Sequence, residues 1–88
     1  MSEQQLQKQI INYLESKGYY VVKVITANKS GVPDILFCKD GRFHGLEVKA
    51  QGKKKNVTEL QKHHIYMINA SGGKALVSDS LEEIKEMF

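Results

Sequence analysis

The dipeptide Asp40-Gly41 constrains the fold of this 88-residue chain more than any other feature. It separates two runs rich in aliphatic and aromatic residues, 34–39 and 42–50. Asp-Gly between such runs is the strongest short signal for a β-hairpin with a two-residue turn. The turn would pair Lys39 with Arg42, and this fixes the partner of every residue farther along both strands. The sequence therefore predicts an antiparallel hairpin in a known register.

This register places two carboxylates opposite each other. Counting back from the turn, Asp34 pairs with Glu47, with Cβ atoms about 4.5–5.5 Å apart on one face. Two facing carboxylates repel each other, and a divalent cation is the natural group to offset that repulsion. Strand alternation puts Lys49 on the same face, about 6.6 Å along the strand, and turns Leu46 and Val48 toward the core. Asp34, Glu47 and Lys49 are thus expected to share one patch.

The patch has the chemistry of phosphodiester hydrolysis. Carboxylate oxygens suit Mg²⁺, which binds phosphate oxygens readily. The Lys49 ammonium could orient a water molecule or stabilise charge that develops on the phosphoryl group. Each residue alone has an ordinary explanation, because Asp after Pro is common in turns and an exposed ion pair of Asp34 with Lys49 contributes little. Because the hairpin register places all three residues on one face, a functional site is favoured over these separate explanations.

The remaining signals alternate between helix and strand. Three helix starts carry a capping-box pattern, in which a Ser or Thr is followed three residues later by Gln or Glu: Ser2–Gln5, Thr58–Gln61 and Ser80–Glu83. Additional strands are expected at 19–25 and 74–78, with loops at 26–33 and 51–56. The order is αβββαβα, and the last βαβ unit should place its strands parallel. The prediction is an α/β fold, a small mixed sheet flanked by helices, forming one domain over residues 1–88.

Basic residues gather after the patch. The formal net charge is only +3, but Lys49 and three further lysines lie within seven residues. An isolated lysine run is usually a solvated loop, whereas beside a carboxylate patch it favours contacts with DNA phosphates. The residues expected to bind DNA are Lys29, Ser30, Lys53, Lys54, Lys55 and Lys62. No base-reading module is visible, so recognition by DNA shape is expected.

Other chemistries are poorly supported. The adjacent His63 and His64 would point about 100° apart on a helix and make a poor zinc site. No Gly-rich loop of nucleotide-binding type is present, and Cys38 lies mid-strand, where it is expected in the core. No apolar run approaches the ~18 residues of a membrane span. With one cysteine and no apparent signal peptide, the chain is expected to be cytoplasmic.

The Gly31-Val32-Pro33-Asp34 loop and the Gly45–Lys49 strand together carry a recognisable pattern. The pattern resembles the PD-(D/E)XK nuclease superfamily, whose core is restriction-endonuclease-like. More narrowly, the chain is similar to stand-alone VRR-NUC domains of the kind encoded by bacteriophages. The resemblance extends to Glu3 and Gln7, to Thr58 through Gln61, and to Gly72-Gly73.

The resemblance implies a role for each matching residue. Asp34 and Glu47 would be metal ligands, helped by the main-chain carbonyl of Val48, and Lys49 would be the catalytic lysine. Glu3 matches an acidic residue that the family brings from its first helix. Gln61 matches a glutamine near the active site, although its capping box with Thr58 explains it equally well. The expected ion is Mg²⁺, with Mn²⁺ as a substitute.

The resemblance also implies a substrate. The family contains structure-specific nucleases, and its small stand-alone members resemble Holliday junction resolvases that act as homodimers. A DNA endonuclease that cuts four-way junctions as a homodimer is therefore expected, in a bacterial host cell if a phage encodes it. Two alternatives stay open: a nuclease for flaps, nicks or duplex ends, and a non-catalytic DNA-binding module of the same fold. Cleavage assays with and without Mg²⁺ would separate them.

Overall fold

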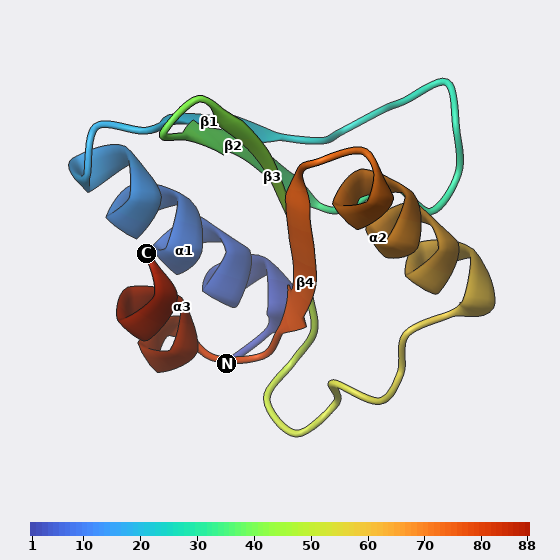
Figure 1. Cartoon of the computed structure of the whole chain (residues 1–88). Coiled ribbons are helices and arrows are strands. Elements are labelled where there is room, and N and C mark those ends of the chain that lie inside the picture. Colours follow the sequence, from blue (N-terminus) through green and yellow to red (C-terminus); the bar gives the residue numbers. More distant parts are fainter.

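The computed structural model describes residues 1–88 and has the element order αβββαβα (Figure 1). The elements are α1 (Glu3–Ser16), β1 (Tyr20–Lys23), β2 (Ile35–Lys39), β3 (Arg42–Val48), α2 (Glu59–Ala70), β4 (Lys74–Ser78) and α3 (Leu81–Met87). This confirms the predicted α/β class and element order. The strand expected at 19–25 is shorter than predicted, and β3 ends one residue before Lys49. No helix combines the length and apolar character needed to cross a membrane.

The sheet has the strand order β1-β2-β3-β4. The first three strands are antiparallel, and β3 and β4 are parallel, as the βαβ unit predicted. Asp40 and Gly41 have φ angles of 55° and 73°, which is the backbone of a two-residue hairpin turn with two positive φ values. Lys39 pairs with Arg42, and Ile35 pairs with Leu46. The predicted register is confirmed. Asp34 precedes Ile35 and Glu47 follows Leu46, so continuing the register by one residue brings Asp34 opposite Glu47.

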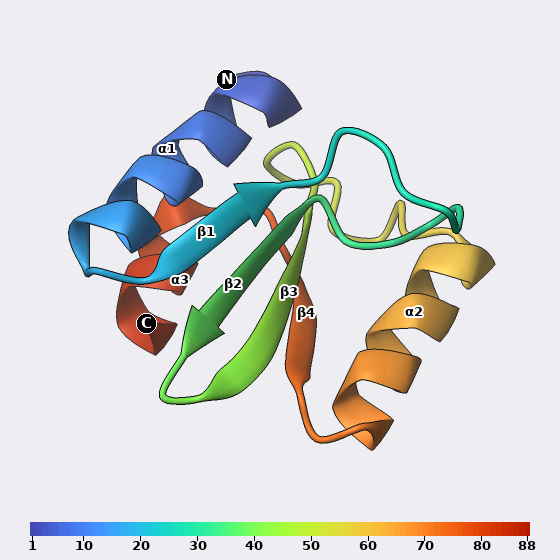
Figure 2. The ribbon, with the colours of Figure 1, turned by 90° about the horizontal axis from the view of Figure 1, so that it is seen from above.

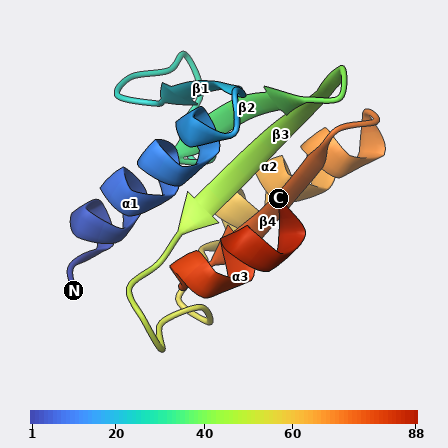
Figure 3. The same cartoon turned by 90° about the vertical axis from the view of Figure 1, so that its left-hand side faces the viewer.

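Helices α1 and α3 cover one face of the sheet, and α2 lies on the other, against β3 and β4 (Figures 1 and 3). The core is packed between the sheet and the pair α1 and α3. Its fully buried side chains include Ile10, Leu14, Ile35, Leu46 and Ile84. Burying each such side chain contributes about 1.5–3 kcal/mol. The core therefore holds the hairpin that carries Asp34 and Glu47.

The second face of the sheet is only partly covered. Helix α2 has no buried residue and lies over β3 and β4, which leaves most outward side chains of β1 and β2 exposed and Leu36 half-buried. Cys38 is among the exposed side chains, so its expected place in the core was wrong. The reason is the two-residue period of a strand, which turns Ile35 and Phe37 inward and Leu36 and Cys38 outward.

Two of the three predicted capping boxes form fully. Both hydrogen bonds are present in Ser2–Gln5 and in Thr58–Gln61. At α3 only half of the box forms: the Ser80 hydroxyl accepts from the Glu83 N–H at 3.0 Å. The Glu83 carboxylate does not return to the cap, because it lies 2.6 Å from the Lys54 ammonium nitrogen.

Candidate active site

The predicted site residues gather at one end of the sheet. Figure 2 shows the loop before β2 and the loop after β3 at this end, together with the first turns of α1 and α2, while the β2–β3 hairpin turn lies at the opposite end. Asp34 immediately precedes β2, Glu47 is the second-last residue of β3, and Lys49 follows β3 directly. The hairpin therefore brings the three residues together, as its register predicted.

The loop before β2 positions Asp34 by packing against α2. Gly31 has a φ of +84°, and a Cβ on it would lie 2.7 Å from Cγ of Leu60. Pro33 is buried against Gly45 of β3. The Asp34 carboxylate then accepts a hydrogen bond from the Val48 N–H at 2.8 Å. The Asp34 main-chain carbonyl accepts from the Val24 N–H at 2.9 Å, next to the end of β1. Asp34 is thus held by its main chain beside β1 and by its side chain at the end of β3.

Replacing Gly31 with alanine is expected to lower the stability of the protein. A residue with a Cβ in the left-handed region costs about 1–2 kcal/mol, and the clash with Leu60 adds about 1–3 kcal/mol of overpacking. Gly18 is the matched control, because its φ is +86° and nothing lies within 4 Å of its would-be Cβ. Urea unfolding of both alanine variants measures the difference. Equal losses for the two would show that contact with α2 does not hold the loop.

Glu47 is an unusual carboxylate because its side chain is only 3% exposed. Burial, followed by hydrogen bonding to and repulsion from Asp34, raises the pKa of Glu47 to about 8. Lys49 opposes this rise in the pKa, with its Nζ 3.8 Å from Glu47 Oε2, and the charge of Glu3 adds slightly to the rise. The pair of facing carboxylates therefore resists carrying two negative charges without a cation.

The side chain of Gln61 connects Lys49, Glu47 and the N-terminus of α2. Its Oε1 accepts from Lys49 Nζ at 3.1 Å, and its Nε2 donates to Glu47 Oε2 at 3.3 Å. The same Oε1 accepts from the Thr58 N–H at 3.0 Å and closes the capping box of α2. The sequence left capping and a place in the site as alternatives, and the structure contains both. Lys49 is consequently held by a helix terminus and is only 12% exposed.

The donor set fits a divalent cation bound mainly by two carboxylates. No three His, Cys, Asp or Glu side chains converge closely enough to hold a metal ion. Glu3 is exposed in the first turn of α1 and does not join Asp34 and Glu47 in such a group. Mg²⁺ commonly uses only one or two protein carboxylates and takes its other ligands from water and substrate phosphate. Asp34, Glu47 and the carbonyl of Val48 match that requirement.

The predicted DNA-binding residues lie in different surroundings. Lys53 and Lys55 are exposed in the loop after β3, whereas Lys54 is paired with Glu83. Lys62 lies on α2 and pairs with Glu59 at 3.2 Å. Lys29 and Ser30 line a surface pocket of about 420 Å³ that they share with residues of α2, among them His63 and His64. Sequence reasoning missed that the two histidines lie beside Lys29, because this contact depends on how α2 packs.

Comparisons with known proteins agree with this fold and show the family. Residues 3–83 match the family model described as archaeal Holliday junction resolvase (Hjc). A solved structure titled "VRR_NUC domain" is 24% identical, with a TM-score of 0.80, over 97% of this chain and 91% of that one. Another, titled "VRR_NUC domain protein", is 20% identical, with a TM-score of 0.81, over 99% and 84%. The search of curated proteins found no significant match. The predicted resemblance to the VRR-NUC fold is confirmed.

Proposed function

Because the chain belongs to the archaeal Holliday junction resolvase (Hjc) family, we propose that it is a Mg²⁺-dependent endonuclease that cuts four-way DNA junctions as a homodimer. The family itself supports a resolvase-like, DNA-cleaving enzyme. The observation that carries the finer proposal is the buried Glu47 facing Asp34, with Lys49 and Gln61 beside them. Mn²⁺ is expected to substitute for Mg²⁺, since it accepts the same oxygen ligands.

Asp34 and Glu47 would hold the ion together with the carbonyl of Val48. When bound, the ion neutralises the carboxylates and polarises the scissile phosphate. The protein contributes the orientation of these ligands. The Val48 N–H fixes one oxygen of Asp34, and the Gln61 amide fixes one oxygen of Glu47. Two hydrogen-bonded carboxylates of fixed direction form a preorganised site rather than two mobile side chains.

Lys49 would orient the attacking water or stabilise the charge that develops on the phosphoryl group. Its ammonium is mostly shielded from solvent, so its field at the phosphate is stronger than that of an exposed lysine. The hydrogen bond to Gln61 holds the ammonium in place before DNA arrives. Glu3, exposed at the rim, would act only through water. The exposed basic residues of the loop before β2 and of the loop after β3 would contact the DNA phosphates.

The uncovered face of the sheet supports pairing of two copies. Phe43 on β3 is 51% exposed, and Met67 on α2 is 46% exposed. Both line a groove of about 420 Å³ with Pro33, Leu36 and Ile68. Contiguous exposed apolar surface of this kind is typical of interaction sites. A four-way junction needs two symmetric cuts, and each chain carries one site, so a two-fold dimer through this face would supply both.

A cleavage panel tests the proposed function. A four-way junction, a flap and a linear duplex are each incubated with the protein and Mg²⁺, Mn²⁺ or EDTA, beside a measurement of mass in solution. We expect paired symmetric cuts in the junction, no cutting in EDTA, and the mass of a dimer. Equal cutting of flaps or duplex would overturn junction specificity. Junction binding without cutting in either metal would identify a non-catalytic DNA-binding module.

A further inference from the structure

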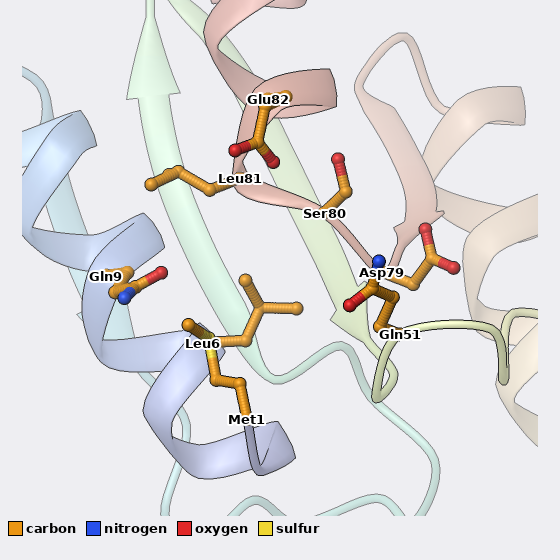
Figure 4. Close-up of a pocket in the computed structure, with 8 residues that line it drawn as sticks. All are labelled: Met1, Leu6, Gln9, Gln51, Asp79, Ser80, Leu81 and Glu82. Carbon is orange, nitrogen blue, oxygen red and sulfur yellow. The ribbon is translucent and has the colours of Figure 1, made fainter.

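The basic loop, residues 51–57, is tied to the start of α3 at two points. The Gly52 N–H donates to Asp79 Oδ2 at 3.0 Å, and the Lys54 ammonium donates to Glu83 Oε2 at 2.6 Å. Both partners belong to the segment that leads into α3 or to its first turn. In Figure 4, Gln51 at the start of the loop lies next to Asp79, beside a cavity of about 220 Å³. The loop is thus docked on the protein.

The backbone of the basic loop adds two tight turns to these anchors. The Lys53 N–H donates to the Ala50 carbonyl, and the Asn56 N–H donates to the Lys53 carbonyl, both at 2.9 Å. Lys53 and Lys55 are exposed, and neither takes part in a salt bridge of the structure. Lys54, between them, is the one lysine of the three that is paired with a carboxylate. The three neighbouring lysines therefore have different environments.

The side chain of Glu83 indicates that this pairing serves the loop rather than the helix. A glutamate at this position can close the capping box of α3, but the Glu83 carboxylate points to Lys54 instead. Its second oxygen, Oε1, is buried without a hydrogen-bond partner. The Glu83 carboxylate holds Lys54 and does not make the second hydrogen bond of the capping box.

We propose that Lys54 is a positioning residue and not a phosphate contact, and that Glu83 and Asp79 hold the basic loop so that Lys53 and Lys55 face the DNA backbone. The inference rests on the proposed function and deepens it, because it assigns α3 a part in junction binding. It also gives Lys54 a different role from Lys53 and Lys55, which the sequence alone does not distinguish.

The direction in which Glu83→Gln changes the affinity for a DNA junction distinguishes anchoring of the loop from direct phosphate contact by Lys54. DNA is a polyanion, so removing a carboxylate near its binding surface strengthens binding through long-range electrostatics. Anchoring predicts the opposite for Glu83→Gln, because the loop loses its partner while the size of the side chain is unchanged. The pair is partly exposed, with 42% of the Lys54 side chain and 32% of the Glu83 side chain accessible. The expected loss of junction affinity is therefore about two- to fivefold.

The experiment measures binding of the full chain to a fluorescent four-way DNA junction in EDTA, at several salt concentrations. Glu82→Gln is the matched control, because Glu82 is an exposed neighbour in the same helix turn and makes no ion pair. Glu83→Gln should weaken binding, and Glu82→Gln should leave it unchanged or tighter. The charge swap Lys54→Glu with Glu83→Lys should restore affinity to within about twofold. Lys53→Gln should reduce the salt slope by about one, as expected for a phosphate contact.

A measurement without DNA keeps this proposal separate from the proposed function. Hydrogen exchange at the amides of Gly52, Lys53 and Asn56 should accelerate in Glu83→Gln and not in Glu82→Gln. Unchanged exchange in Glu83→Gln would overturn the anchoring, as would tighter junction binding or a charge swap that binds more weakly than either single variant. If the parent neither binds nor cuts junctions, the proposed function fails, while amide exchange still decides whether Glu83 anchors the loop.

Discussion

Lys49→Ala is expected to lower the rate of DNA cleavage by about 10²–10³-fold, the usual effect of removing one preorganised donor from a charge-stabilising site. The loss should fall on the chemical step, because Lys49 is mostly buried beside Gln61 and Glu47 and is therefore not one of the exposed charges that attract DNA. Single-turnover cleavage of a four-way junction at saturating protein and Mg²⁺ measures this step directly. Junction affinity in EDTA should stay within about threefold of the parent.

Lys17→Ala is the matched control for Lys49→Ala. Lys17 is exposed at the C-terminal end of α1, away from the end of the helix that faces the site. Its removal takes the same charge from the protein and should leave cleavage unchanged. Full cleavage activity in Lys49→Ala would remove Lys49 from the mechanism. A loss confined to DNA affinity would instead make it a phosphate contact.

Glu47→Gln is expected to stabilise the metal-free protein at neutral and alkaline pH while abolishing cleavage. In the unfolded chain Glu47 ionises near pH 4.5, whereas the folded protein keeps its proton up to about pH 8. Between these values the folded state binds the extra proton, so the free energy of unfolding falls as pH rises, by at most about 1.4 kcal/mol per pH unit. An amide cannot ionise and removes this slope. The gain at pH 8 should be of the order of 2–4 kcal/mol.

Urea unfolding in EDTA from pH 5 to pH 8 measures the effect, with Glu15→Gln as the control because Glu15 is exposed on α1. The parent and Glu15→Gln should lose stability together across this range, and Glu47→Gln should not. Adding Mg²⁺ at pH 8 should raise the stability of the parent, since it binds the folded state alone, and should have little effect on Glu47→Gln. A parent whose stability does not change between pH 5 and pH 8 would contradict the raised pKa of Glu47.

The part of the site geometry that depends on turn type and strand alternation could be predicted from the sequence. Asp40-Gly41 permits only a small set of turns, and a two-residue turn determines every pair along the two strands. Strand alternation then decides the face of each side chain, which is why Asp34, Glu47 and Lys49 converge as expected. The same alternation, applied to β2, would have placed Cys38 outward. The core position predicted for Cys38 was wrong because the two-residue period of the strand, and not the apolar character of its neighbours in sequence, decides which face a side chain occupies.

Contacts between elements far apart in the sequence could not be predicted in this way. Gln61 was expected either to cap α2 or to lie near the site, and only the packing of α2 against β3 lets one amide do both. Glu83 was expected to close the cap of α3, and the docked loop diverts its carboxylate to Lys54. A cap is a local hydrogen bond, so sequence predicts it, but a competing partner from another element can override it.

The sequence alone determined the α/β order, the hairpin and the three residues on its polar face, because turn type and two-residue alternation act over a few neighbouring residues. The tertiary structure alone decided how strongly Glu47 resists ionisation, which helix holds Lys49, and which lysine of the basic loop is held by α3. These depend on burial and on distances between atoms of separate elements. The electrostatic energies vary steeply with both, and no spacing along the chain encodes them.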